Sequence, residues 1–243
     1  MVPTASQIEQ FRRDGYFTTE VLFDERTLHG VQDEFDRLWQ ENIAEVQKTG
    51  DAKAAELARL RPFIGEVHKH SDICRRLCFL PVFQELSRQL IGPDADLFYN
   101  QAVCKPPGKG RSLAWHQDNQ YGLTDPLAYI TCWVAISRAT VDNGTIWLVP
   151  GMHKQGMLPH IWGEEAREWQ CQLDTSYKQP VVLRAGQMAV FSSLLPHSSG
   201  PNTSGETRYA YVVQYHHGGV KKKGTHEPYG DQVPLLRGGR AVV

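Results

Sequence analysis

The sequence predicts a fold that is mainly β with N-terminal helices, and its β part has the pattern of an antiparallel sandwich or jelly roll. Residues 1–94 show amphipathic patterns of helical period. Residues 95–243 instead show short runs of β-branched and aromatic residues, separated by Gly, Pro, Asn and Asp. The 243 residues fit one large domain, and no linker-like stretch separates the two parts. We therefore expect residues 1–243 to form a single domain with a jelly-roll core over 95–243.

The N-terminal part is predicted to be helical with one strand. Ser6 and Glu9 have the spacing of a capping box, and Gly15 ends the first helical pattern. Asp24 is expected to cap a long amphipathic helix that runs to Gly50, because apolar residues between them recur at helical spacing. The other elements expected in this part are a strand over residues 16–23 and helices over residues 51–60, 72–79 and 81–91.

Strand-like runs dominate the chain from residue 95 onward. Their turn-rich spacing favours antiparallel sheets over alternating β and α units. One segment departs from the pattern, since "GEEAREWQCQL" over residues 163–173 is predicted to form a short helix in a long connection. The strand-like runs are "ADLFYNQAVCKPP", "LAYITCWVAIS", "GTIWLVPG", "QPVVLRAG", "QMAVFSS" and "TRYAYVVQYHH".

Composition and charge argue against several classes of function. The 26 basic and 27 acidic residues give a net charge of −1, so the whole-protein charge matches neither nucleic acid nor an anionic membrane. No apolar run approaches the length of a membrane span, and the N-terminus lacks the apolar core of a signal peptide. The five cysteines include no C-x-x-C pair, which favours reduced, buried thiols over disulfides or a thiolate zinc site. We expect a cytoplasmic protein.

Two copies of the pattern H-x-D raise the question of a metal site. His and Asp two positions apart on a strand point to the same face. Two histidines and one carboxylate form the facial triad of non-haem iron(II) oxygenases, which leaves positions open for cosubstrate and oxygen. The copy at residues 116–118 lies among strand runs and is either half of such a site or two polar residues at a loop. The copy at residues 70–72 precedes a helical pattern, where Ser and Asp serve as caps, and we predict a structural role for it.

A third ligand and an anion-binding side chain are candidates further along the chain. Ser199 shares a strand face with His197, and Arg208 follows the short segment "GPNTSGE" (200–206). A tight turn in that segment would make its flanks neighbouring strands, with His197 and Arg208 facing one interior. A buried arginine needs an anion, and its planar fork suits a carboxylate. The arrangement predicts a pocket for a small dicarboxylate, whereas the alternative for Arg208 is a surface position at a strand edge.

Six motifs follow one another in the second half of the chain: "CKPPG", "WHQDNQY", "CWVAI", "DNGTIWLVPGMHK", "LPHSSGPN" and "RYAYVVQYH". Together they resemble the phytanoyl-CoA dioxygenase-like family of iron(II)/2-oxoglutarate-dependent oxygenases. The resemblance runs from about Tyr99 to the C-terminal "PLLRGGR", and the N-terminal helices fit the family more loosely. It implies a double-stranded β-helix, a cupin-like jelly roll with helices packed on one sheet.

The resemblance also implies roles for individual residues. The positions that match the iron ligands of the family are His116, Asp118 and His197. The positions that match contacts to 2-oxoglutarate are Arg208 and Ser199, for the carboxylate far from the iron, and Lys105 and Trp133. Gln101 is an inference from the strand pattern, because it shares a face with Lys105 and can donate to the carboxylate nearest the iron.

The resemblance implies an enzyme that uses Fe(II), 2-oxoglutarate and O2, releases succinate and CO2, and oxidises a C–H bond of a small organic molecule, most often by hydroxylation. The substrate class stays open between a secondary metabolite, an acyl compound and an amino acid. Two other functions also stay open: a non-catalytic jelly-roll ligand-binding protein, and a divalent-metal hydrolase or isomerase that uses the same triad. We expect a small-molecule partner and neither nucleic acid nor a membrane, and the sequence does not set the oligomeric state.

Several other residues near these motifs are candidates for the substrate pocket or for a structural role. Tyr121, Trp147 and Trp162 can shape an apolar substrate pocket, although aromatic residues in strands more often pack in a core. His160 is expected to be partly exposed and structural. The Gly- and Pro-rich segment over residues 106–112 is predicted to form a mobile lid ahead of the first ligands.

Overall fold

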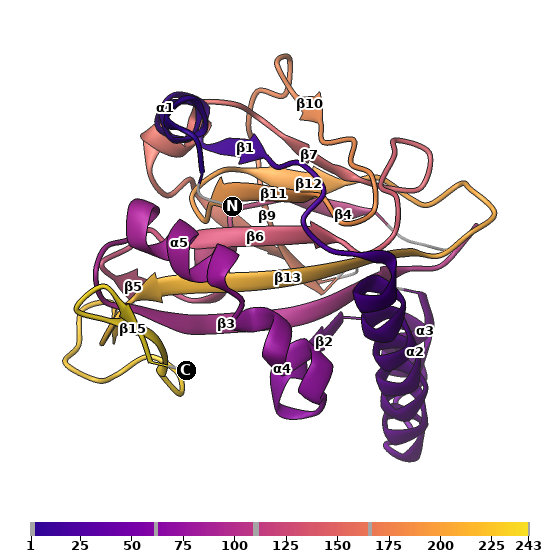
Figure 1. The fold of residues 1–243 in the computed structure, drawn as a ribbon. Coiled ribbons are helices and arrows are strands. Elements are labelled where there is room, and N and C mark those ends of the chain that lie inside the picture. The colour runs from indigo at the N-terminus through magenta and orange to yellow at the C-terminus, as the bar shows by residue number, and fades with distance from the viewer. Residues whose placement is uncertain (1–2, 61–62, 109–111, 165–166, 243) are drawn as a thin grey trace.

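The computed structural model describes residues 3–60, 63–108, 112–164 and 167–242. Helices occupy the N-terminal third and strands the rest, as predicted (Figure 1). Within the described residues, no helix is long and apolar enough to cross a membrane. The N-terminal elements are α1 (Ala5–Asp14), β1 (Tyr16–Thr18), α2 (Glu25–Lys48), α3 (Ala52–Leu60), β2 (Phe63–Gly65), the 3-10 helix η1 (Val67–Lys69), α4 (Asp72–Cys78) and α5 (Pro81–Leu90).

The helix ends confirm part of the sequence prediction and correct another part. Asp24 caps α2 by accepting a hydrogen bond from the backbone N–H of Thr27 at 2.7 Å, and Gly15 ends α1 in the left-handed conformation with φ +85°. The predicted capping box at Ser6 and Glu9 is wrong. Thr4 forms the box instead, because its hydroxyl and backbone N–H exchange hydrogen bonds with Gln7, so the helix begins earlier than expected.

Two antiparallel sheets form the β part, and all six predicted runs contain a strand. The larger sheet has the order β1-β11-β6-β13-β3-β15-β16 with β2 also paired to β3, and the smaller has the order β10-β7-β12-β4. Two short two-stranded sheets complete the fold, the pair β5–β14 and the hairpin β8–β9, and the fold is a jelly roll as predicted. The bounds are β3 (Ala95–Lys105), β4 (Leu113–His116), β5 (Thr124–Asp125), β6 (Ile130–Ala135), β7 (Ile146–Leu148), β8 (His160–Gly163), β9 (Glu168–Cys171), β10 (Gln179–Pro180), β11 (Met188–Ser192), β12 (His197–Ser199), β13 (Arg208–His217), β14 (Lys221–Lys222), β15 (Val233–Arg237) and β16 (Arg240–Ala241).

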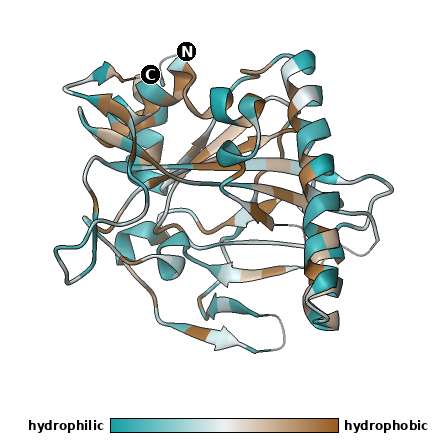
Figure 2. Cartoon of the chain, turned by 90° about the horizontal axis from the view of Figure 1, so that it is seen from below, coloured by the Kyte–Doolittle hydropathy of each residue, from teal (hydrophilic) through white to brown (hydrophobic). Residues whose placement is uncertain are grey.

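The larger sheet has a helix-covered face and a face that looks toward the smaller sheet. On the helix side, Phe35 of α2 packs edge-on against Tyr211 of β13 at 5.5 Å between ring centroids, and Phe83 of α5 packs against Tyr215 at the same distance. Figure 2 shows hydrophobic residues on the central strands and a mixed hydrophobic and hydrophilic pattern along the long helix α2. Because side chains alternate along a strand, the neighbours of these tyrosines on β13 face the space between the sheets, where the site lies.

Two predicted elements differ from the structure. The strand expected over residues 16–23 ends at Thr18, the last residue of β1. The helix expected over residues 163–173 is wrong, because β8 and β9 pair there as a hairpin with Trp162 opposite Trp169, and their rings meet at 5.5 Å. This cross-strand aromatic contact outweighs the weak helical preference of the segment, of which residues 165–166 lie outside the described residues.

Candidate metal centre

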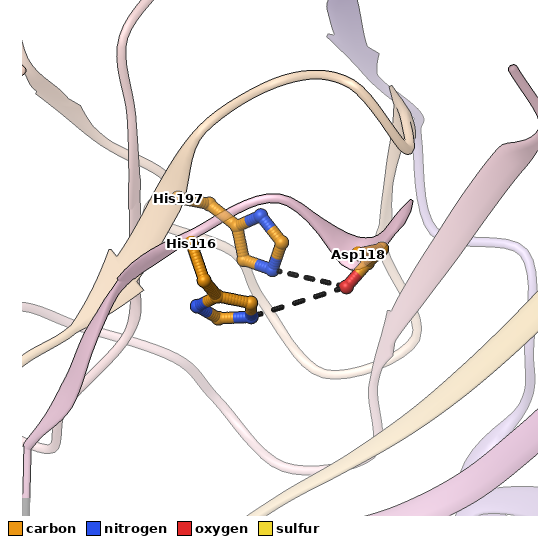
Figure 3. A group of neighbouring side chains, drawn as sticks. All are labelled: His116, Asp118 and His197. Atoms are coloured by element: carbon orange, nitrogen blue, oxygen red, sulfur yellow. Dashed lines mark ion pairs between the residues drawn. The ribbon is translucent and has the colours of Figure 1, made fainter. Parts of the chain in front are cut away.

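Two neighbouring strands of the smaller sheet bring the candidate ligands together. His116 is the last residue of β4, and His197, the first residue of β12, is its register partner. Asp118 follows at the start of the 3-10 helix η2 (Asp118–Tyr121). Figure 3 shows both imidazole rings and the carboxylate turned toward one point. Residues that lie about 80 positions apart in the chain therefore form one cluster, and each offers one donor atom within 4.8 Å of the others.

The geometry of this cluster suits a divalent metal ion. Oδ1 of Asp118 lies 3.5 Å from Nε2 of His197 and 3.9 Å from Nε2 of His116. Nitrogen and oxygen ligands sit about 2.0–2.2 Å from such an ion, which places neighbouring donors roughly 3–3.5 Å apart. The Asp118–His197 distance already lies in this range, the Asp118–His116 distance is slightly longer, and all three donor atoms lie within 4.8 Å of one another. Two histidines with one carboxylate are the ligand set of the iron(II) facial triad.

Backbone carbonyls set the tautomer of both histidines. Nδ1 of His116 donates to the Ala114 carbonyl at 2.8 Å, and Nδ1 of His197 donates to the Leu195 carbonyl at 3.1 Å. A neutral imidazole that carries its proton on Nδ1 has its lone pair on Nε2. Because Nδ1 of each ring is engaged with a carbonyl, Nε2 is the nitrogen that faces the Asp118 carboxylate and that is left to bind a metal.

Gln117, between the two ligands of the H-x-D copy, fixes the turn that carries them. It is fully buried, and its side-chain amide donates to the carbonyls of Gly156 at 2.8 Å and Leu194 at 2.7 Å. Its Oε1 accepts from the backbone N–H of Leu158 at 2.8 Å, and its own backbone N–H donates to Nε2 of His160 at 3.1 Å. Sequence reasoning missed Gln117, while the structural role expected for His160 agrees with this contact.

A buried cation lies on the opposite sheet. Arg208, the first residue of β13, is 1% exposed, and its guanidinium lies over the Trp133 ring at 5.1 Å from the ring centroid. It donates to the Gly144 carbonyl at 3.1 Å, but its Nε has no hydrogen-bond partner among the described residues. Burial lowers the pKa of Arg208 to about 10, which leaves the side chain charged at neutral pH. A buried guanidinium with an unused N–H is suited to bind a carboxylate.

Ser199 and Lys105 complete this end of the site. Nζ of Lys105 on β3 donates to Oγ of Ser199 on β12 at 2.7 Å, and both residues are buried. Because the serine oxygen accepts from the lysine, the serine hydroxyl keeps its own proton for a second acceptor. Ser199 lines the same cavity as Arg208. Lys105 is not among the lining residues and is connected to the site by its hydrogen bond to Ser199.

The predicted strand pairing in this region is wrong. β12 and β13 are not neighbours, because β12 pairs with β4 and β7 in the smaller sheet while β13 lies between β6 and β3 in the larger. The connection between them crosses from one sheet to the other, and Asn202 fixes it by donating to the carbonyls of Lys105 and Glu206. His197 and Arg208 still face one interior, as expected, but they do so from opposite walls.

One cavity of about 520 Å³ joins the metal cluster to the arginine. Gln101 and Trp133, both predicted from the sequence, lie on its wall. Tyr121 lines it as well, whereas Trp147 and Trp162 are not among its lining residues. The predicted lid falls partly on residues 109–111, which lie outside the described residues. The remaining wall is strongly aromatic, with contributions from Phe63, Phe98, Tyr99, Tyr129, Phe191 and Tyr229.

Comparison with known proteins identifies the family. Residues 11–210 match the family model described as phytanoyl-CoA dioxygenase (PhyH). A phytanoyl-CoA dioxygenase of Arabidopsis thaliana is 28% identical over 60% of this chain, which spans 53% of that protein. A methylphosphonate hydroxylase of Gimesia maris is 28% identical over 87% of this chain and 80% of its own length. Among solved structures, the non-haem monooxygenase ThoJ superposes with a TM-score of 0.71 at 28% identity, over 90% of this chain and 80% of that one.

The match covers well over half of the chain and confirms the resemblance seen in the motifs. It also confirms the predicted enzyme class and the predicted cofactor set of Fe(II), 2-oxoglutarate and O2. The relatives named above are a dioxygenase, a hydroxylase and a monooxygenase, which favours an oxygenase over a non-catalytic binding protein or a hydrolase. The chain belongs to the phytanoyl-CoA dioxygenase family of Fe(II)- and 2-oxoglutarate-dependent non-haem oxygenases.

Proposed function

We propose that this protein is a dioxygenase that hydroxylates a C–H bond of a small organic molecule and releases succinate and CO2 from 2-oxoglutarate. One observation carries the proposal. A single cavity holds the cluster of His116, Asp118 and His197 on one wall and the buried, incompletely paired Arg208 on the other. A metal site beside a dicarboxylate anchor is what a 2-oxoglutarate-dependent reaction needs, and neither half alone would point to it.

The three side chains of the triad would hold the iron, and as only three ligands they would leave positions for other groups. His116 and His197 would each bind through Nε2, since their Nδ1 protons are engaged with backbone carbonyls, and Asp118 would bind through its carboxylate. When bound, iron with 2-oxoglutarate and O2 would supply the oxidising power for the substrate C–H bond. The protein positions the reactants and limits the access of water to the site, and the burial of both histidines supports this role.

Arg208 anchors the cosubstrate at the end far from the iron. Its Nε–H and charge suit the distal carboxylate of 2-oxoglutarate, and the Ser199 hydroxyl adds a second donor. Lys105 orients that hydroxyl by donating to its oxygen, and the Trp133 ring holds the guanidinium plane. Gln101 lines the same cavity and would donate to the carboxylate at the iron end.

The aromatic part of the cavity is where the substrate would lie. The Phe98 ring packs at a tilt against the rings of Tyr129 and Tyr229, with centroids 4.7 Å and 5.1 Å away, which gives an aromatic wall suited to a mid-sized apolar or aromatic molecule. At the rim, Lys69 pairs with both Glu66 and Asp231, so the charge of this cation is already balanced. The cavity of about 520 Å³ has room for 2-oxoglutarate and one small substrate. The name of the Gimesia relative supports hydroxylation as the outcome.

The proposal is tested by turnover under 18O2. The Fe(II)-loaded protein is incubated with 2-oxoglutarate and a panel of small aromatic and aliphatic molecules, and succinate and products are measured by mass spectrometry. We expect succinate in proportion to a product that carries one 18O atom, and neither from the His197→Ala protein. Succinate formation that is equal in the His197→Ala protein, or product oxygen that comes only from water, would overturn the proposal.

A further inference from the structure

Two residues on the larger sheet hold the oxygen of Asp118 that faces away from the histidines. We infer that Thr131 and Gln214 are positioning residues that keep Asp118 a one-oxygen ligand, so that a full face of the metal stays open for cosubstrate and O2. The inference rests on the metal site of the proposed function. It concerns neither the ligands themselves nor the residues that anchor 2-oxoglutarate.

The contacts form a closed ring of three hydrogen bonds. The Thr131 hydroxyl donates to Oδ2 of Asp118 at 2.6 Å, and Nε2 of Gln214 donates to the same oxygen at 3.0 Å. The Gln214 amide also donates to the Thr131 hydroxyl oxygen at 3.2 Å. The amide has two protons, so it serves both acceptors, and the threonine that accepts from it keeps its own proton for the carboxylate. Such chains of hydrogen bonds strengthen one another in a buried setting.

Burial shows how specific this ring is. Thr131 is fully buried and Gln214 is 5% exposed, and polar groups buried in this way need partners. Among the described residues, the hydrogen bonds that their side chains make run only to each other and to Asp118. The hydrogen bonds to Asp118 therefore account for the presence of these two polar side chains on the inner face of the larger sheet.

The two carboxylate oxygens of Asp118 have different partners. Oδ1 lies toward both histidine Nε2 atoms, while Oδ2 is occupied by two donors. A carboxylate that turned to bind a metal through both oxygens would have to give up at least one of these two hydrogen bonds, because Oδ2 has only two lone pairs. It would also take one of the positions that the facial triad leaves for 2-oxoglutarate and O2. The ring thus favours the coordination that the reaction needs.

The ring also connects the two sheets at the metal. Asp118 follows β4 of the smaller sheet, whereas Thr131 and Gln214 are register partners on β6 and β13 of the larger sheet. Arg208, the cosubstrate anchor, starts the same strand β13 and faces the same cavity. The larger sheet therefore carries both the hydrogen-bond donors that hold the metal carboxylate and the cosubstrate anchor.

Anaerobic titration with Co(II), followed by visible absorption, tests the inference without any turnover. The variants are Thr131→Val, which removes the hydroxyl at nearly constant shape, Thr131→Ser, which restores it, and Gln214→Met on the other strand. Loss of an outer-shell partner of a metal ligand typically costs about 10–100-fold in metal affinity. We expect Thr131→Val and Gln214→Met to weaken Co(II) binding by this factor and to change the intensity of the cobalt band as Asp118 changes its mode of binding. We expect Thr131→Ser to resemble the wild type in both readouts.

The results distinguish a role of Thr131 and Gln214 in metal binding from a role in the stability of the fold alone. Circular dichroism first establishes that each variant is folded, and the pair on different strands provides a second variant if one fails. Wild-type affinity and an unchanged cobalt spectrum in both Thr131→Val and Gln214→Met would overturn the inference while leaving the metal site intact. If Thr131→Ser binds Co(II) as weakly as Thr131→Val, the inference is also overturned, because the Thr131 hydroxyl would then not be the group that supports metal binding. If the folded wild-type protein binds no Co(II), the metal site of the proposed function fails, and this inference fails with it.

Discussion

The chain contains the pattern H-x-D twice, and the two copies do different work. In the copy at residues 70–72, Ser71 caps α4 by accepting from the backbone N–H of Cys74, while His70 and Asp72 are exposed. In the copy at residues 116–118, the histidine is 4% exposed and lies 4.2 Å from the ring of His197, between ring centroids. We infer from this difference that the pattern can serve as a metal site only where the fold supplies a third ligand and buries the group.

Ligand removal has the largest expected effect and tests the comparison directly. We expect His116→Ala, Asp118→Ala and His197→Ala to abolish Fe(II) binding, because two remaining ligands cannot hold the ion in a facial triad. The matched control is His70→Ala in the other copy, which should bind Fe(II) like the wild type. Isothermal titration under anaerobic conditions gives the affinities. Wild-type affinity in any of the three ligand variants would remove that residue from the site.

The cosubstrate anchor comes next. Arg208→Ala removes a buried charge-assisted contact, which should weaken 2-oxoglutarate binding by about 2–4 kcal/mol, or roughly 30- to 1,000-fold, with Fe(II) binding retained. Arg184→Ala, an exposed arginine beside Glu20, is the control and should leave both affinities unchanged. An unchanged affinity for 2-oxoglutarate in Arg208→Ala would exclude this arginine from the cosubstrate site.

Gln117, the middle residue of the copy at 116–118, provides a further test of the comparison. Gln117→Ala leaves the Gly156 and Leu194 carbonyls and the Leu158 N–H without their side-chain partner, which should cost on the order of 3 kcal/mol of unfolding free energy. Because these bonds fix the turn between His116 and Asp118, metal affinity should fall as well. Urea unfolding and Co(II) titration measure the two effects. A stable variant with intact metal affinity would show that the turn does not depend on Gln117.

A buried histidine that binds no metal gives a contrast in pH dependence. Burial lowers the pKa of His216 to about 4, so the folded state resists its protonation. Above pH 6.5 the imidazole is neutral in both the folded and the unfolded state. As the pH falls toward 4, the unfolded state takes up the proton first, and the free energy of unfolding falls by about 3 kcal/mol. We expect the metal-free wild type to lose more unfolding free energy between pH 7 and about pH 5 than His216→Phe does. Parallel pH profiles of the two proteins would show that His216 does not control this loss.

The smallest effect belongs to the cap in the first copy. Ser71→Ala removes the side-chain acceptor for the N–H of Cys74 and should cost about 1 kcal/mol of unfolding free energy. Metal affinity should not change, because α4 lies on the helix-covered side of the larger sheet and Ser71 is not among the cavity residues. Thermal unfolding with and without Co(II) measures both quantities. A loss of metal affinity in Ser71→Ala would contradict the separation between the two copies.

Local patterns predicted much of this molecule. The helix started by Asp24 and ended near Gly50, the end of α1 at Gly15 and the six strand-containing runs all depend on residues close together in the chain. His116 and Asp118 could be paired from their spacing alone. His197 was a candidate third ligand from its place beside Ser199 on one strand face, and the resemblance to a family matched it to an iron ligand. The division of the chain into one domain remains a prediction.

What the sequence could not supply was set by contacts between distant segments. The position of β12 depends on pairing with β4 and β7 rather than on its short separation from β13. The hairpin at residues 160–171 depends on the contact between Trp162 and Trp169. Thr131 and Gln214 carry no motif, and their relation to Asp118 appears only when the two sheets face each other.

The central claim is that the copy at residues 116–118 is part of an iron site that shares its cavity with a 2-oxoglutarate anchor. Anaerobic titration of the metal-free protein with Fe(II) and then 2-oxoglutarate tests it, because the chelated pair has a visible charge-transfer band. We predict the band in the wild type and in His70→Ala, its absence in His116→Ala, and a need for much more 2-oxoglutarate in Arg208→Ala. A folded wild-type protein that shows no band, or a band that persists in His116→Ala, would contradict the account.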